Sequence, residues 1–203
     1  MRPLSPITLA AFVLMGMMPL SLRAQANYLK NTDLKEGFSF WHGDGESIFL
    51  NPDGTEGAEG DKDVIPVIKI SLSKNDPRSV HQDFETPNEP KSLNFRVLVY
   101  ASSDFKRSTF ADDYSSSINW IAGQTLCLYP EEVIPNVDFW IRGAPGLIYI
   151  LSNDLKPNTW ATVTGTWPPS PPPGTDRTVT FCVPPGDGAV YIREAAVTTP
   201  STP

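Results

Sequence analysis

Histidine is scarce in this 203-residue chain, and the common sequence signatures of catalysis are missing as well. Only His42 and His81 occur, so a nucleophilic triad would need one of these rings paired with an acid and a Ser or Cys. No nucleophile elbow, H-E-x-x-H motif, phosphate loop or dinucleotide-binding glycine pattern is present. Acids are abundant, so paired carboxylates for glycoside hydrolysis stay open as an alternative, with no pattern that singles out a pair. The sequence therefore favours a protein that is not an enzyme.

Long apolar runs are also absent, apart from one at the start of the chain. Ile7 to Leu22 is apolar and follows Arg2, but Pro19 interrupts it, and it falls short of the roughly 18 residues that span a bilayer. Ala24-Gln25-Ala26 then fits the small-x-small cleavage rule. We expect residues 1–26 to be a signal peptide and the mature protein to be periplasmic or extracellular, without membrane insertion.

Positive charge is in short supply. Loss of Arg2 and Arg23 with the signal leaves 14 basic residues against 23 acidic ones, a net charge of −9. Such a surface repels phosphate backbones, so nucleic acid is excluded as a partner. Removing 26 of 203 residues leaves 177, which suits one core. We expect one domain over 27–198 and a flexible tail over 199–203.

Cysteine is limited to Cys127 and Cys182, each within an apolar run that resembles a strand. A disulfide between them would close a loop of about 55 residues and contribute about 3–4 kcal/mol, and an exported protein permits it. The alternative is that both are small buried hydrophobic residues. Both readings stay open.

The rest of the chain predicts an all-β fold. Alternating and β-branched runs recur between Gly- and Pro-rich turns such as Asn51-Pro52-Asp53-Gly54. The expected strands are 47–50, 65–72, 80–86, 92–101, 125–129, 137–142, 147–152, 159–166, 178–183 and 189–197. Eight to ten strands in one domain favour a two-sheet jelly-roll β-sandwich. A long insertion, Ser102–Gly123, is polar but carries Trp120, which argues against disorder.

Four stretches, in order, resemble galactose-binding-like jelly-roll carbohydrate-binding modules. They are the segment from Asn27 to Trp41, the Gln-containing strand 80–84, the turn and Trp-led strand 156–166, and the closing strand 191–197. The resemblance implies a secreted, non-catalytic module that binds a polysaccharide or glycan, with envelope or glycan-degrading enzymes as partners. The alternative is a cell-envelope structural or protein-interaction sandwich without a glycan site; a glycan-active hydrolase or lyase ranks third.

The resemblance also implies a structural calcium, but this sequence departs from the pattern. Lys35 stands where the family has an acid, and Ala195 replaces one acid of the closing strand. Asp33, Glu36 and Glu194 are left as candidate oxygen ligands, because calcium prefers several hard oxygens. Solvated turn residues are the alternative. We therefore expect any effect of calcium to be weak.

Side-chain alternation predicts a binding face. On 92–101, Leu93, Phe95, Val97 and Val99 share one face, and on 137–142, Val137, Phe139 and Ile141 do so. The opposite faces carry Asn94, Arg96 and Tyr100 on one strand, and Asp138, Trp140 and Arg142 on the other. If both strands lie in one sheet, these residues form a glycan site, with Trp120 as a further contact. The alternative is a structural Arg–Asp pair with a covered aromatic. Trp41 is expected in the core.

Overall fold

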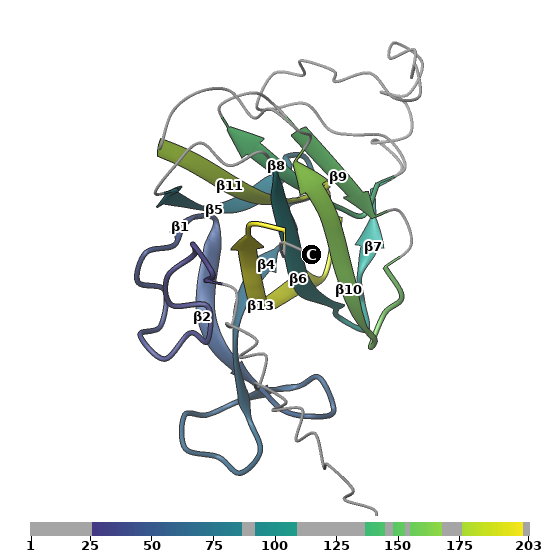
Figure 1. Cartoon of the computed structure of the whole chain (residues 1–203). Helices are drawn as coiled ribbons and strands as arrows, with labels where there is room; N and C mark the ends of the chain where they lie inside the picture. Colours follow the sequence, from purple (N-terminus) through teal and green to yellow (C-terminus); the bar gives the residue numbers. More distant parts are fainter. Residues whose placement is uncertain are drawn as a thin grey trace, which may run out of the picture.

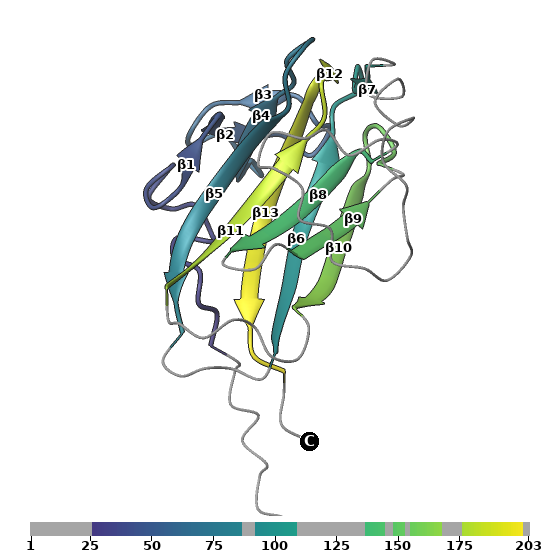
Figure 2. The ribbon, with the colours of Figure 1, turned by 90° about the horizontal axis from the view of Figure 1, so that it is seen from above.

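The chain folds as two antiparallel β-sheets packed face to face, seen as two layers in Figures 1 and 2. The computed structural model describes residues 26–86, 92–108, 137–144, 148–152, 155–167 and 176–200. Residues 1–25, Trp120, Cys127 and the predicted strand 125–129 lie outside this part. Among the described residues, no helix has the length and apolarity needed to cross a membrane.

Each sheet mixes strands from distant parts of the chain. The five-stranded sheet has the order β1-β5-β11-β8-β9, formed by β1 (His42–Gly43), β5 (Arg78–Glu85), β11 (Asp176–Val183), β8 (Phe139–Ala144) and β9 (Ile148–Ser152). The six-stranded sheet has the order β10-β6-β13-β4-β2-β3, formed by β10 (Trp160–Trp167), β6 (Leu93–Ala101), β13 (Ala189–Thr198), β4 (Ile65–Ser71), β2 (Gly45–Leu50) and β3 (Glu56–Gly57). β7 (Lys106–Arg107) pairs with β12 (Gly186–Asp187).

The predicted all-β jelly-roll sandwich is confirmed. Every expected strand that falls on described residues is present, within two residues at each end. The strands that were not predicted, β1, β3, β7 and β12, have two residues each. So short a segment carries no alternation from which a strand could be inferred.

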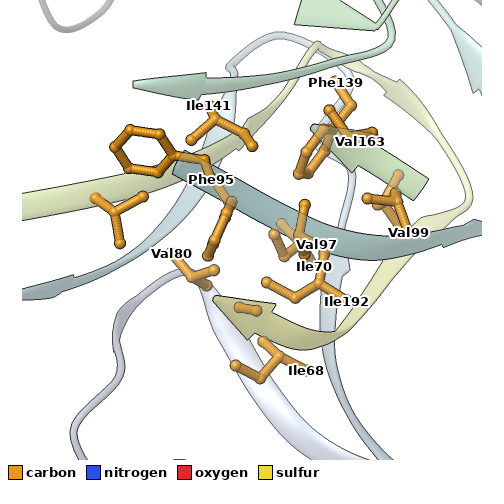
Figure 3. Packing of buried hydrophobic residues seen from close by; sticks show 14 of the residues in the cluster. Ile68, Ile70, Val80, Phe95, Val97, Val99, Phe139, Ile141, Val163 and Ile192 are labelled. Carbon is orange, nitrogen blue, oxygen red and sulfur yellow. The ribbon is translucent and has the colours of Figure 1, made fainter. Parts of the chain in front are cut away.

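The core lies between the inner faces of the two sheets (Figure 3). Its members are buried apolar side chains from both sheets, among them Ile68, Ile70, Val80, Phe95, Val97, Val99, Phe139, Ile141, Val163 and Ile192. The inward sets predicted on β6 and β8 are therefore confirmed. Trp41 is also buried here and lies against Phe181, with ring centres 5.7 Å apart. Burial of each such side chain contributes about 1.5–3 kcal/mol, so this layer provides most of the stability of the sandwich.

The N-terminal segment ties the two sheets together. Its backbone N–H at Tyr28 donates to the Val197 carbonyl of β13 over 2.9 Å. On the other sheet, the buried Gln82 of β5 accepts from the Lys30 N–H at 2.6 Å and donates to the Lys30 carbonyl at 3.0 Å. Gln82 thus satisfies both polar groups of one residue in a place where water is excluded.

Candidate functional site

The predicted binding residues lie on opposite outer faces of the sandwich. β6 belongs to the six-stranded sheet and β8 to the five-stranded sheet, so the condition that both strands share a sheet is not met. Asn94, Arg96 and Tyr100 therefore occupy one outer face, whereas Trp140 and Arg142 belong to the other sheet and Asp138 directly precedes β8. The structure does not bring these six residues into one site.

Two residues on the β8 side have structural roles. Asp138 Oδ1 accepts from Arg107 Nη1 at 2.9 Å, and its Oδ2 accepts from the Leu155 N–H at 3.0 Å. Trp140 is only 3 % exposed. The alternative reading, an Arg–Asp pair beside a covered aromatic, therefore describes Asp138 and Trp140, and neither offers a free surface to a ligand.

The outer face of the six-stranded sheet carries a row of aromatic rings that is largely covered. Tyr100 lies between Trp160 and Tyr191, with ring centres 5.3 Å and 5.8 Å away. Its side chain is 5 % exposed, its hydroxyl donates to Asn158 Oδ1 at 3.1 Å, and burial raises its pKa. Gly54 lies against this hydroxyl: a Cβ built there would be 1.9 Å from it. The turn that contains Gly54 thus closes the row to a flat sugar ring.

The remaining predicted residues of that face are engaged with their neighbours. Asn94 Oδ1 accepts from Thr166 Oγ1 of β10 at 3.1 Å. Arg96 is 48 % exposed at its side chain and lies 3.6 Å from Glu194 Oε2. Both are surface contacts between adjacent strands, of a kind that contributes little to stability.

The outer face of the five-stranded sheet presents a row of polar side chains that crosses the sheet. The register pairs His42 of β1 with His81 of β5, His81 with Thr180 of β11, and Thr180 with Arg142 of β8. The backbone register continues from Arg142 to Tyr149 of β9. His42 is exposed, His81 and Arg142 are half-buried, and Thr180 is buried. Imidazole and guanidinium groups are planar donors, so the row offers hydrogen bonds in fixed directions.

A hollow of about 740 Å³ adjoins this row at the end of β5 and β11. Asp83 and Thr178, which are Cα partners, line it and are joined by a 2.5 Å hydrogen bond from Thr178 Oγ1 to Asp83 Oδ1. Because Asp83 follows His81 by two residues on the same strand, both belong to the same outer face. The rest of the described lining is Tyr28, Lys30, Phe84, Glu85, Asp176 and Arg177. A volume of this size is typical of small-ligand sites.

Of the sequence-predicted binding residues, only Arg142 belongs to this row. His42, His81, Asp83, Thr178 and Thr180 were not predicted. Side-chain alternation could have placed His81 on the outer face, because Val80 and Phe84 of the same strand point into the core. The missing information was which strands are neighbours, and that is not encoded locally. Trp120 lies outside the described residues and remains a prediction.

The residues at the opening turn do not fit a calcium ion. No group of three His, Cys, Asp or Glu residues suited to a metal occurs in the described part of the chain. Asp33 is paired with Lys35 at 2.7 Å, and Glu194 is paired with Arg193. The carbonyls of Gly37 and Ser39 accept instead from Asn31 Nδ2, at 2.9 Å and 3.1 Å.

The Asn31 side chain organises this turn from within. Its Oδ1 also accepts from the Glu36 N–H at 3.0 Å, so one neutral amide makes three hydrogen bonds to the loop. Asp33 and Glu36 are exposed turn residues, whereas Glu194 lies within β13, half-buried and paired with Arg193 and Arg96. The described residues do not bring the three acids together as a metal-binding group.

Comparison with known proteins bears on the fold. No family model and no curated protein matches the sequence. Among solved structures, the module TmCBM61 in complex with β-1,4-galactotriose is 12 % identical, with 86 % of this chain and 99 % of that chain covered and a TM-score of 0.52. The chain has the fold of a carbohydrate-binding module. A xylan-binding domain from family 22 of these modules is 13 % identical, with coverages of 88 % and 98 % and a TM-score of 0.50.

The fold of these carbohydrate-binding modules also occurs inside longer proteins. The enzymatically active domain of tailspike protein 4 from bacteriophage CBA120 is 10 % identical, with 85 % of this chain but only 21 % of that chain covered and a TM-score of 0.51. At identities this low, the similarity establishes the fold and leaves the ligand to be argued from the site.

Proposed function

We propose that the protein is a non-catalytic carbohydrate-binding module that holds a glycan along the outer face of its five-stranded sheet. The row of His42, His81, Thr180 and Arg142 beside the hollow carries this proposal. A sugar chain presents hydroxyl groups along its length. The row spans four neighbouring strands, and His42, His81 and Arg142 supply imidazole and guanidinium groups along a line that such a chain can follow. Thr180, between His81 and Arg142, is buried at 7 % exposure and fills the space between them.

The opposite face is a poorer candidate. In its aromatic row Tyr100 and Tyr191 are buried, and the turn at Gly54 lies against Tyr100. Trp160 is half-buried, with the Arg193 guanidinium 5.7 Å from its ring centre, and sugar stacking requires an exposed ring. On the proposed face, by contrast, His42 and Asp83 are exposed. Around the hollow, Asp83, Glu85 and Asp176 outnumber the cationic Lys30 and Arg177, so a neutral sugar chain fits better than a polyanion.

Export and partnership with other proteins form part of the same proposal. The apolar run after Arg2 and the Ala24-Gln25-Ala26 site support removal of a signal peptide and a periplasmic or extracellular location. A similar fold lies within an arabinose-bound α-L-arabinofuranosidase, of which this chain covers 27 %, at 6 % identity and a TM-score of 0.51. This likeness supports a glycan-degrading enzyme as a partner.

Two arginines on opposite faces provide a matched test. On a glycan array followed by calorimetry with the best ligand, Arg142→Ala should weaken binding tenfold or more, about 1.4 kcal/mol, because directional hydrogen bonds are lost. Arg96→Ala removes the same group from the other face and should leave the affinity unchanged. The reverse pattern in folded variants would move the site to the six-stranded sheet.

An array without any hit would favour the alternative, an envelope protein-interaction sandwich. If glycans bind but neither arginine matters, Trp120→Ala tests the insertion that sequence analysis put forward as a further contact. Melting temperatures of all variants must accompany the affinities, because Arg142 lies beside the buried Cys182.

A further inference from the structure

The two histidines of the chain lie side by side on neighbouring strands. They are 39 positions apart in the sequence, yet His42 of β1 and His81 of β5 are Cα partners. Their ring centres are 5.5 Å apart, and the ring planes are inclined by 37°. His42 is exposed and His81 is half-buried.

The chain on either side of His42 fixes its position. Trp41 anchors one side in the core. On the other side, Gly43 has a φ of +113°, and a Cβ there would lie 2.3 Å from the Ser79 carbonyl. Only glycine allows β1 to approach β5 so closely.

Asp44 then clamps the end of β1 onto β5. Its N–H donates to the Ser79 carbonyl at 2.8 Å, and its carboxylate accepts from the Ser79 N–H at 3.2 Å and from Arg78 Nη1 at 2.8 Å. The two-residue strand β1 is therefore held in register by three consecutive features: the buried Trp41, the close approach at Gly43 and the hydrogen bonds of Asp44. Preorganisation of this kind is what a pair of ligands requires.

We propose that His42 and His81 together bind one divalent transition-metal ion through one ring nitrogen each. A metal–nitrogen bond is about 2.0–2.1 Å long, so two imidazoles on one ion need ring centres roughly 5–6 Å apart. The observed separation meets this requirement. Imidazole ligands suit Cu²⁺, Ni²⁺ and Zn²⁺ rather than Ca²⁺ or Mg²⁺, and Cu²⁺ binds most tightly in that series.

The site is open on its outer side. No third His, Cys, Asp or Glu completes a metal-binding group with these rings among the described residues, so water fills the remaining coordination positions. Thr180, the neighbour of His81 on β11, is uncharged, and Asp83 is the nearest acid on the same face of β5. The ion would lie at the β1 edge of the row proposed for glycan binding, and its binding does not depend on that function.

Copper titration of the purified protein, prepared without a histidine tag and without glycan, tests the proposal. Calorimetry should show one Cu²⁺ per chain, and electron paramagnetic resonance should show nitrogen ligands. His42→Ala and His81→Ala should each weaken binding at least tenfold, whereas Asp76→Asn, which removes a surface acid elsewhere, should not.

Three results would overturn the site. These are the absence of saturable binding at millimolar Cu²⁺, wild-type affinity in either single variant, and wild-type affinity in the double variant. His42 is exposed, so His42→Ala retains the fold and keeps the test decisive even if His81→Ala unfolds. Glycan affinity measured separately in metal-free buffer shows whether the proposed function stands on its own.

Discussion

At the scale of single residues, Cys182 shows how burial controls reactivity. It lies on β11, opposite Trp140 of β8, and is 6 % exposed. Burial raises the pKa of the thiol to about 12, against a smaller lowering by the nearby Arg142 charge. Within the described part of the chain Cys182 has no disulfide partner, and its burial agrees with the interpretation as a small buried hydrophobic residue. The disulfide with Cys127 stays a prediction. Cys127 lies outside the described residues.

Cys182 should therefore resist alkylation in the folded protein. With Cys127→Ser as background, iodoacetamide at pH 8 should label Cys182 only after unfolding, because the thiolate is the reactive form. In the wild-type chain, counting thiols by mass spectrometry after unfolding without a reductant tests the disulfide, and two thiols would exclude it. Recovery of none would establish the disulfide instead.

The same thiol predicts a loss of stability at alkaline pH. Between the ordinary pKa of 9.0 and the folded value of about 12, the unfolded chain releases this proton and the folded one retains it. Unfolding free energy should then fall by up to about 1.4 kcal/mol per pH unit through this window. Cys182→Ala should reduce the slope of denaturant-derived stability against pH between pH 9 and 10. Tyr and Lys also begin to titrate there, and the difference between the two slopes isolates the contribution of the thiol.

At the scale of elements, the turn between β2 and β3 closes one face of the molecule. Its Gly54 N–H donates to the Asn51 carbonyl at 2.9 Å, and Asp53 Oδ1 accepts from the N–H and hydroxyl of Thr55. These bonds hold Gly54, with a φ of +86°, against the Tyr100 hydroxyl. The turn thus covers rings that would otherwise resemble a sugar-stacking platform.

Gly54→Ala should destabilise the protein for two reasons, backbone strain at a positive φ and a steric clash with Tyr100. The positive φ costs a non-glycine residue about 1–3 kcal/mol, and the new methyl group would collide with Tyr100. Gly60→Ala is the matched control, because Gly60 has a φ of +93° but no atom within 4 Å of the added Cβ. Denaturant unfolding should show a clearly larger loss of unfolding free energy for Gly54→Ala than for Gly60→Ala. Equal losses would mean that the turn moves away from Tyr100 without further destabilisation.

Strand faces were predictable from the sequence, whereas strand neighbours were not. The inward residues Phe95 and Val97 of β6, and Phe139 of β8, follow from alternation alone. However, β6 and β8 have similar alternating patterns of apolar residues. The sheet to which each strand belongs is decided by its partner, which is β13 for β6 and β11 for β8. Such pairings are long-range, so the predicted site combined residues of two faces, and the His42–His81 pair went unseen.

At the scale of the whole molecule, the opening turn is organised by a side-chain amide. Asn31 bonds to the backbone at Gly37, Ser39 and Glu36, where a cation could otherwise gather carbonyl oxygens. Thermal melts in millimolar calcium and in chelator should therefore differ by less than about 2 °C. An ion at a hundredfold excess over its Kd would add about 2.7 kcal/mol, or roughly 5–10 °C, and a shift of that size would contradict the amide-organised turn.

The hydrogen bonds between Tyr28 and Val197, and between the Val197 N–H and Asn27 Oδ1 at 3.0 Å, place the two ends of the sandwich side by side. In Figure 2 the purple start of the described N-terminal segment and the yellow end of β13 lie at the same end of the molecule. A pull on these ends loads the bonds one after another, as in opening a zip, rather than all together in shear. Under tension the N-terminal segment therefore peels away first, and the sheets that carry the polar row stay intact until that seam has opened.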